Sequence, residues 1–295
     1  MKVIVLDGGI SPERAVSLRS GARIVRALRT CGMLVSEIDW QEELSCTLLA
    51  ECAAADAVFL ALHGGDGENG VLQAFLDKGG VHHYTGSDAG GAEIATDKPR
   101  AKAAVSAFGV PVAKGCVTSV RDQAPPLAYP FVAKPRTGGS SLGFSVIRDQ
   151  KDWESRQEGE LLCETYLPGR EFTVGILAGQ ALPVVEIRPV GGVYDYEHKY
   201  RVGGAEELCP APIDEKKAER LARYAVTAFH VLGLRDSARL DFREDATGEP
   251  CFLEANVLPG MTETSLFPLA AKTENIPFDA LCLAMAEMAA KRKDR

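Results

Sequence analysis

Two short segments near the C-terminus carry carboxylate, amide and guanidinium groups at alternating positions. Residues 237–242 and 251–255 are typical of strands, and the turn Asp245-Ala246-Thr247-Gly248 joins them. If this turn centres between residues 246 and 247, Arg239 faces Glu254 and Asp241 faces Phe252 across the hairpin. The period of two along a strand then places four polar side chains on one face of the sheet: Arg239, Asp241, Glu254 and Asn256.

This polar face has two interpretations. Carboxylate and amide oxygens are the ligands that Mg²⁺ prefers, so Asp241, Glu254 and Asn256 could hold a metal ion beside the Arg239 guanidinium. Alternatively, the face is simply exposed and carries a cross-strand Arg–Glu pair. A slip of one residue in register would destroy the metal arrangement. Phe252 lies on the same face in this register and has no evident role there.

A second predicted hairpin contains a glycine-rich loop. Strands over residues 131–134 and 144–147 flank Gly138-Gly139-Ser140-Ser141-Leu142-Gly143. The loop lacks the lysine of a Walker A motif and the helix that follows a dinucleotide fingerprint. Its backbone amides could still wrap a phosphate, or the segment could be an ordinary surface hairpin. Lys134, at the end of the preceding strand, favours an anion.

Elements that could position these groups begin at the N-terminus. Strands over residues 3–6, 35–38 and 57–62 alternate with helices, which predicts a small parallel sheet with helices on its faces. One helix is expected to open at Ser11-Pro12-Glu13, with Ser11 as its N-cap. Ligands bind such sheets at the carboxyl ends of the strands. Loops containing Gly8-Gly9 and His63-Gly64 follow two of those ends.

The C-terminal part has a different pattern of predicted elements. Strands over residues 172–177 and 182–187 precede a long irregular stretch at 191–212, and loops of this length are usually functional or disordered. Within it, aromatic and charged residues alternate from Tyr194 to Tyr200, which favours a lid or substrate clamp. Asp214 is expected to cap a strong amphipathic helix, and a final helix is expected over residues 278–289.

Composition excludes several classes of protein. The 295 residues suggest two domains or one large α/β unit, and 46% hydrophobic with 25% charged residues is ordinary globular composition. A net charge of −8 argues against general nucleic-acid binding. No apolar run reaches the ~20 residues of a membrane span. The eight cysteines contain no Cys-x-x-Cys pair, which favours free thiols in a reducing cytoplasm.

Taken together and in order, the motifs resemble the ATP-grasp D-alanine–D-alanine ligases. No single string is specific, but their order and spacing are, and they span nearly the whole chain. The matching strings are Gly8 to Leu18, His63 to Gly70, Tyr84 to Ser87, Asp97-Lys98, Lys134 to Gly143, Gly169 to Val174, Tyr194 to Tyr200, and Glu254 to Leu266.

The resemblance implies an α/β fold, α+β in part. It is an ATP-grasp fold with an N-terminal Rossmann-like parallel-sheet domain. Residues 1–95 would form that substrate domain, and 96–170 a central ATP-grasp lobe with the Gly/Ser phosphate loop. Residues 171–295 would form a C-terminal ATP-grasp lobe with the lid loop and the metal site. A cytoplasmic homodimer acting on small molecules, with no nucleic-acid or membrane partner, would also be expected.

The implied reaction is ATP-dependent ligation of two D-alanines through an acyl phosphate, for peptidoglycan precursor synthesis. Two Mg²⁺ or Mn²⁺ ions on Asp241, Glu254 and Asn256 would bridge the phosphates. By the same resemblance, ATP would contact Lys98, Lys134, Ser140, Ser141, Glu164, Glu171 and Lys199. The catalytic group would be Glu13, Ser140, Tyr200, Arg239 and Gly260, with the Gly260 amide as an oxyanion donor.

Substrate residues carry over in the same way. Glu13, with His63 nearby, would accept the ammonium of the first D-alanine, and Ser265 and the Leu266 amide would hold the second carboxylate. Arg239 and Gly260 would also contact the substrate. Tyr200, with Glu13 and Ser140, would close the site, and this tyrosine favours an amine rather than a D-lactate acceptor.

Some positions depart from the family pattern. Asp7 stands where an apolar residue is usual, Val257 and Leu258 follow Asn256, and Glu263 adds a negative charge near the expected acceptor carboxylate. Two alternatives follow. One is a dipeptide ligase of the same fold with a different acceptor, in secondary metabolism. The other is a non-catalytic nucleotide-binding regulator, which the intact Arg239, Asp241, Glu254 and Asn256 disfavour.

Overall fold

The computed structural model describes residues 1–41, 43–119, 124–139, 143–156, 159–189 and 205–293. Its N-terminal part is a parallel sheet in the order β2-β1-β3, formed by β1 (Lys2–Gly8), β2 (Leu34–Trp40) and β3 (Ala57–Leu60). One face is covered by α1 (Arg14–Thr30) and, from the far end of the chain, α10 (Phe278–Ala290). The other face packs on α2 (Cys46–Ala53) and α3 (Val71–Lys78). This arrangement confirms the Rossmann-like parallel sheet.

The start of α1 differs from the prediction. Glu13, rather than Ser11, is the N-cap residue, and it makes no side-chain capping bond. The Ser11 hydroxyl accepts from the Glu13 amide at 3.2 Å, ahead of the helix, and donates to the His63 carbonyl at 2.6 Å. The N-cap expectation was therefore wrong, because α1 begins three residues after Ser11. Ser11 ties the loop after β1 to the loop after β3. That tie brings Glu13 and His63 to the same edge of the sheet.

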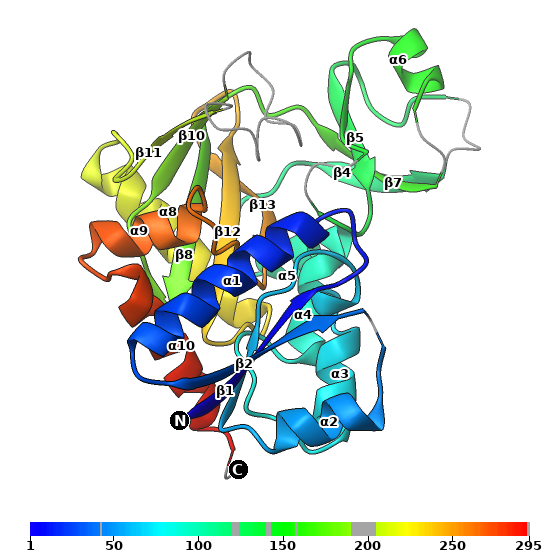
Figure 1. The fold of residues 1–295 in the computed structure, drawn as a ribbon. Helices are drawn as coiled ribbons and strands as arrows, with labels where there is room; N and C mark the ends of the chain where they lie inside the picture. The colour runs from blue at the N-terminus through cyan, green and yellow to red at the C-terminus, as the bar shows by residue number, and fades with distance from the viewer. Residues whose placement is uncertain (42, 120–123, 140–142, 157–158, 190–204, 294–295) are drawn as a thin grey trace.

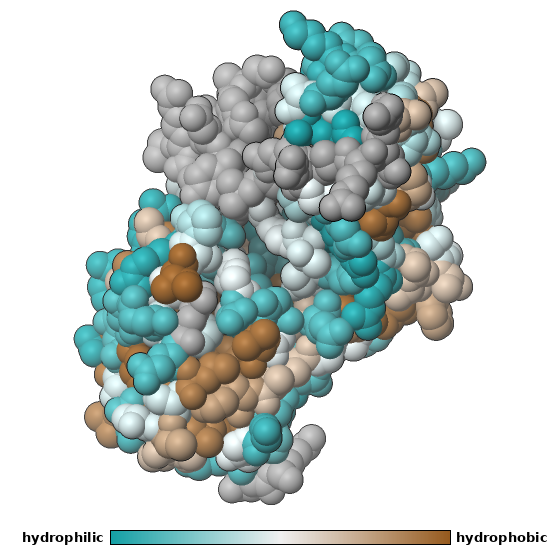
Figure 2. Space-filling model, turned by 90° about the vertical axis from the view of Figure 1, so that its right-hand side faces the viewer, coloured by the Kyte–Doolittle hydropathy of each residue, from teal (hydrophilic) through white to brown (hydrophobic). Residues whose placement is uncertain are grey.

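Two helices and an antiparallel sheet follow. Helix α4 (Ala89–Thr96) and helix α5 (Lys98–Ser106) are capped by Asp88 and Asp97. The sheet runs in the order β4-β7-β5-β6, with β4 (Gly115–Ser119), β5 (Phe131–Pro135), β6 (Ser145–Ile147) and β7 (Glu160–Thr165). Phe131 and Trp153, from α6 (Gln150–Glu154), fill its small core. This unit projects from the rest of the molecule (Figure 1), and hydrophilic residues cover its outer end (Figure 2).

The largest sheet runs in the order β11-β10-β8-β12-β13, and β9 (Gln180–Ala181) pairs with β8. Its strands are β8 (Glu171–Leu177), β10 (Val185–Pro189), β11 (Ala205–Leu208), β12 (Ser237–Glu244) and β13 (Pro250–Asn256). The irregular stretch expected over 191–212 thus contains a strand, which pairs antiparallel with β10. Helix α8 (Glu215–Val231) begins at its Asp214 cap as predicted.

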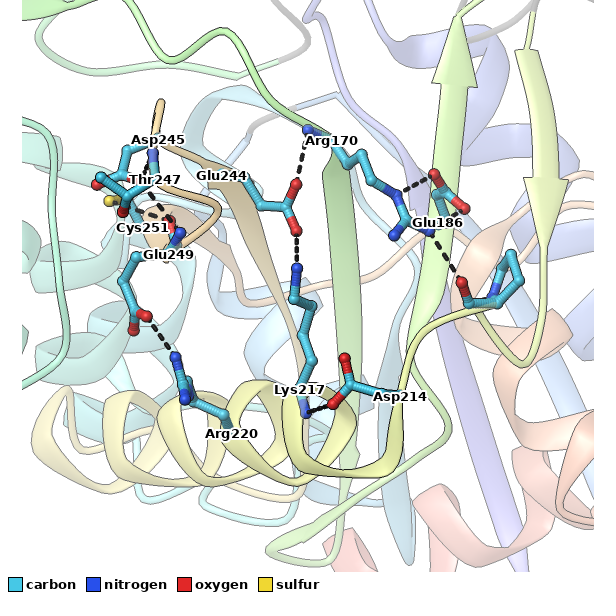
Figure 3. A network of polar contacts seen from close by, with 11 residues as sticks. Arg170, Glu186, Asp214, Lys217, Arg220, Glu244, Asp245, Thr247, Glu249 and Cys251 are labelled. Carbon is cyan, nitrogen blue, oxygen red and sulfur yellow. Dashed lines mark hydrogen bonds and ion pairs between the residues drawn. The ribbon is translucent and has the colours of Figure 1, made fainter.

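Alternation divides this sheet into two faces. Phe172, Val174, Leu240 and Phe242 point into a core shared with Leu221 and Phe229 of α8. Ion pairs reinforce that side: Lys217 of α8 lies 2.6 Å from Glu244, and Arg220 lies 2.5 Å from Glu249 (Figure 3). Helix α9 (Leu266–Thr273) packs with its Phe267 against Gly175 on the other face. Beyond α9, four odd-numbered residues of β8 and β12 line a cleft and an adjoining pocket: Glu171, Arg239, Asp241 and Arg243.

The fold can be compared with the expectations about free cysteines, membrane spans and domains. The eight cysteines all lie within the described residues and are free thiols. Among the described residues, no helix combines the length and the apolar character that crossing a membrane requires. The three sheets fall one each within 1–95, 96–170 and 171–295, and the exact domain boundaries remain a prediction.

Candidate active site

The hairpin β12–β13 has a different register from the one predicted. Arg239 pairs with Asn256 and Asp241 with Glu254, so the expected pairs with Glu254 and Phe252 were wrong by two positions. The turn closes between Asp245 and Glu249 around three residues instead of two, with Gly248 at φ +84°. A bulge between Asp241 and Phe242 then makes Leu253 the extra residue in β13.

The bulge explains the position of Phe252, which had no evident role in the predicted register. Phe252 pairs with Phe242 and is fully buried in the core on the far side of the sheet. Despite the register error, the four polar residues do line one common cavity: Arg239, Asp241, Glu254 and Asn256. The error left their shared face unchanged because a shift of two residues preserves the alternation.

Asp241 is the most tightly held member of this group. It is 7% exposed and accepts hydrogen bonds from Arg239, Nε to Oδ1 at 3.0 Å and Nη2 to Oδ2 at 3.1 Å. The Thr173 hydroxyl of β8 donates to Oδ1 at 2.6 Å. A buried carboxylate needs such compensation. The pairing orients Asp241 and Arg239 toward the same space.

The predicted metal ligands have suitable chemistry. Asp241 and Glu254 are cross-strand partners, and the Asn256 Oδ1 accepts a hydrogen bond from the Leu258 amide at 3.2 Å. Lys98 Nζ lies 3.8 Å from Glu254. Within the described residues, no three His, Cys, Asp or Glu side chains converge on one point. Two carboxylates and one amide oxygen are a set that hard cations accept when phosphate oxygens or water complete the coordination.

A narrow pocket of about 120 Å³ lies between the β4–β7 sheet and the largest sheet. Apolar side chains form its walls, including Ala113, Val132, Val146, Leu167 and Leu253. Its lining also contains polar groups: Lys98, Lys134, Glu164, Glu171, Asp241 and Arg243. A pocket lined by both apolar side chains and charged groups suits a flat heterocycle that carries a charged tail.

Glu164 is the most buried acid of this pocket. Lys134 Nζ lies 2.8 Å from its Oε2, and Lys102 Nζ lies 2.5 Å from its Oε1. Burial alone would raise the pKa of Glu164, but the two ammonium groups lower it below its usual value. Glu171, at the start of β8, accepts from Arg243 Nη1 at 3.1 Å. Lys98 donates to the Gly138 carbonyl, which ties helix α5 to the glycine loop.

The loops after β1 and β3 of the N-terminal sheet line the same cavity as the charged face of β12 and β13. Glu13 is 7% exposed and His63 is 6% exposed, and both line the cavity. His63 Nε2 lies 3.2 Å from the Ser20 hydroxyl, and its Nδ1 lies 3.7 Å from Glu68. Gly64 has φ +69°, and a Cβ there would lie 2.8 Å from Glu13 Oε2. The glycine therefore makes room for the Glu13 carboxylate.

The segment between β13 and α9 forms the third wall. Ser265 precedes the first turn of α9, and its hydroxyl accepts from the Thr262 amide at 2.9 Å. A Cβ on Gly260 would lie 2.8 Å from that hydroxyl, so glycine permits close approach there. Glu263 is not among the cavity-lining residues and pairs with Arg23 at 3.2 Å. Its charge is therefore partly compensated outside the cavity.

These walls enclose one cleft of about 620 Å³. The predicted site residues that line this cleft or the narrow pocket are Glu13, His63, Lys98, Lys134, Glu164, Glu171, Arg239, Asp241, Glu254, Asn256, Gly260, Ser265 and Leu266. Predictions for Ser140 and Ser141 of the glycine loop, and for the lid with its Lys199 and Tyr200, fall outside the described residues.

Several residues in the site or directly behind it were not predicted from the sequence. Arg243 follows Arg239 and Asp241 at the same period of two, so alternation alone could have indicated it. Lys102 lies one helical turn after Lys98, which is a weaker signal. Thr173 is the cross-strand neighbour of Asp241 from β8, and only the strand order reveals that contact. Val257 and Leu258, the apolar departures after Asn256, are buried.

Comparisons with known proteins agree with this geometry. Residues 113–287 match the family model described as D-ala D-ala ligase C-terminus. The D-alanine--D-alanine ligase of Granulibacter bethesdensis is 42% identical, over 99% of this chain and 98% of its own, and that of Acidiphilium cryptum is 41% identical over 99% of each. The crystal structure of the Bacillus anthracis D-alanine--D-alanine ligase superposes with a TM-score of 0.86 at 27% identity, covering 100% and 99%. Its complex with ATP gives 0.84 at 25% identity, with the same coverage.

Proposed function

Since the chain belongs to the D-alanine–D-alanine ligase family, we propose that it uses ATP to join two D-alanines into D-alanyl-D-alanine for peptidoglycan precursor synthesis. One observation carries the proposal most strongly. A single cleft brings together Glu13 and His63 from the N-terminal sheet, the charged face of β12–β13, and the Gly260–Leu266 segment. The cleft thus combines amine recognition, phosphate chemistry and carboxylate recognition.

The nucleotide occupies the narrow pocket in this proposal. Its base lies between Val132 or Val146 and Leu253, with Glu164 and Glu171 at the base and ribose side. Lys98 and Lys134 neutralise phosphate oxygens near the Gly138–Gly139 backbone, and Ser140, Ser141 and Lys199 complete the set. Phosphoryl transfer depends on positioning and on charge neutralisation more than on covalent help from the protein.

The reaction then proceeds in two steps. A carboxylate oxygen of the first D-alanine attacks the γ-phosphorus, and ADP leaves as the acyl phosphate forms. The amine of the second D-alanine attacks the acyl carbon, and phosphate leaves from the tetrahedral intermediate. Arg239 and the Gly260 amide stabilise the developing negative charge in both steps. Excluding water from the cleft, the role proposed for Tyr200 and its segment, prevents hydrolysis of the acyl phosphate.

Substrate orientation follows from the cleft walls. Glu13 accepts the ammonium of the first D-alanine, and the buried His63 borders it. Ser265 and the amide of Leu266 bind the carboxylate of the second D-alanine at the N-terminus of α9, where exposed amides favour anions. Because Glu263 is paired with Arg23, it does not oppose that carboxylate from within the cavity.

Metal ions have a place in the same proposal. Asp241, Glu254 and Asn256 would hold two Mg²⁺ or Mn²⁺ ions. Bound there, the ions would neutralise charge on the ATP phosphates. The pairing of Asp241 with Arg239 and Thr173 orients its carboxylate toward the cleft in advance.

Assembly and location are further parts of the proposal. We expect a homodimer in the cytoplasm, as the family resemblance and the eight free thiols suggest. Light scattering of the purified protein tests the dimer directly, and a monomer at micromolar concentration would contradict it.

The experiment that tests the function measures phosphate release from Mg·ATP with D-alanine, L-alanine or D-lactate, and identifies the product by mass spectrometry. D-alanine alone should support release and yield D-alanyl-D-alanine. Release only with another acceptor would instead indicate the dipeptide ligase of different specificity. No release with any amino acid would support the non-catalytic regulator.

A further inference from the structure

A second buried lysine lies behind the nucleotide pocket. Lys102 is on α5, one turn after Lys98, and is 5% exposed. It is not among the residues that line the pocket or the cleft, whereas Lys98 lines both. Its ammonium lies 2.5 Å from Glu164 Oε1 and donates to the Phe252 carbonyl at 3.2 Å. Lys102 therefore reaches the pocket only through another side chain.

Glu164 divides its two oxygens between two lysines. Lys102 takes Oε1, and Lys134, which does line the pocket, takes Oε2 at 2.8 Å. The other nearby charged group is Glu254 of β13. Burial, and then the neighbouring Lys134, lower the pKa of Lys102 to about 8. A buried carboxylate between two cations has little freedom to turn.

The contacts of Lys102 also join separate parts of the fold. It connects α5 to β7, in the projecting sheet, and to β13, in the largest sheet. Phe252 forms a further bridge there with Val112, which precedes β4. Lys102 thus lies where the two walls of the nucleotide pocket meet.

We propose that Lys102 is a positioning residue for the nucleotide: it fixes the Glu164 carboxylate, and through it Lys134, in the pocket between the two sheets. The inference rests on the proposed use of ATP. Without Lys102, Glu164 would pair with Lys134 alone. Both side chains could then turn away from the nucleotide, whereas the D-alanine sites, on the other walls of the cleft, would be unaffected.

The test is a double-mutant cycle of Lys102→Met and Glu164→Gln, read by steady-state kinetics. Lys102→Met should raise KM for ATP about tenfold or more. It should leave KM for D-alanine unchanged and kcat at saturating ATP within about threefold, because no reacting atom is touched. In the Glu164→Gln background, the same substitution should have no further effect on KM for ATP. Independent effects that multiply in the double variant would overturn the proposal.

A matched control separates positioning from general destabilisation. Lys217→Met breaks a comparable ion pair with the buried Glu244, away from the cleft (Figure 3). It should leave KM for ATP unchanged even if the melting temperature falls. An equal rise in KM for ATP in both lysine variants would also overturn the proposal.

Two further measurements keep the result decisive. If Lys102→Met does not fold, the comparison is between Glu164→Gln and the double variant, which should have the same KM for ATP. A higher KM for ATP in the double variant would contradict the inference. Calorimetric binding of ATP to the wild type and the variants extends the test to a protein without ligase turnover. A wild type that binds ATP but releases no phosphate would reject the proposed function without rejecting the role of Lys102.

Discussion

Arg239 and Asp241 form a two-pronged ion pair along a single strand, with Nε and Nη2 of the arginine donating to the two carboxylate oxygens at 3.0 and 3.1 Å. They lie two positions apart, so both side chains emerge on the same face of β12. Bidentate pairing fixes orientation as well as charge. The arginine thus stands beside the predicted metal ligands with its position already set.

Arg239→Ala should lower turnover by about 10²-fold or more, because it removes a charge that stabilises the transition state. Phosphate release at saturating ATP and D-alanine measures this, with circular dichroism to check the fold. Arg220→Ala is the control, since Arg220 pairs with Glu249 on the α8 side of the sheet. Equal turnover in wild type and Arg239→Ala would remove this residue from the catalytic group.

Glu254→Gln should raise the Mg²⁺ concentration for half-maximal activity by about tenfold or more, because an amide is a weaker ligand than a carboxylate. A magnesium titration of the initial rate measures it. Glu249→Gln, four residues after Asp245 on the same hairpin, provides the comparison because its carboxylate faces Arg220 and Tyr224 instead. Identical magnesium curves for the two variants would exclude Glu254 as a ligand.

Gly64→Ala should raise KM for D-alanine by about tenfold or more and leave KM for ATP unchanged. The new Cβ would displace Glu13, whose Oε2 lies 2.8 Å away, and the positive φ adds strain of about 1–3 kcal/mol. Gly32→Ala isolates the strain, since Gly32 has φ +79° with nothing within 4 Å. If both variants keep the wild-type KM for D-alanine, the position of the Glu13 carboxylate does not depend on Gly64.

Asp7→Asn should stabilise the protein at pH 8 and have little effect at pH 4. Burial, together with the neighbouring Glu37 and Asp39, raises the pKa of Asp7 from 3.8 to about 7. A folded state that binds this proton more tightly loses stability as pH rises from about 4 to 7, by at most about 4 kcal/mol. Urea unfolding of both proteins at several pH values measures the difference.

Asp56→Asn should change the stability at pH 8 in the opposite direction, and it serves as the control for Asp7→Asn. The Lys2 amide and Lys293 lower the pKa of Asp56, so its contribution is present above the usual carboxyl range and is lost in acid. A stability difference between Asp7→Asn and wild type that does not vary from pH 4 to 8 would show that Asp7 keeps an ordinary pKa.

Local patterns predicted a large part of the fold. The apolar runs before Gly8-Gly9 and His63-Gly64 indicated parallel strands, and Asp214 marked the start of α8, because caps and periodicity act between near neighbours. The same patterns failed where distant chain segments compete. Ser11 looked like an N-cap, yet the helix begins three residues later, and the Ser11 hydroxyl donates to the His63 carbonyl, 52 residues away.

The sequence by itself determined which residues share the charged face of β12 and β13, because alternation survives an error of two in register. Tertiary structure decided the rest. The three-residue turn and the bulge at Leu253 set the true cross-strand pairs of the hairpin. Thr173 contacts Asp241 because β8 lies beside β12. Lys102 contacts Glu164 because helix α5 packs close to β7. Such contacts depend on how separate elements pack against one another, and no short-range pattern encodes that packing.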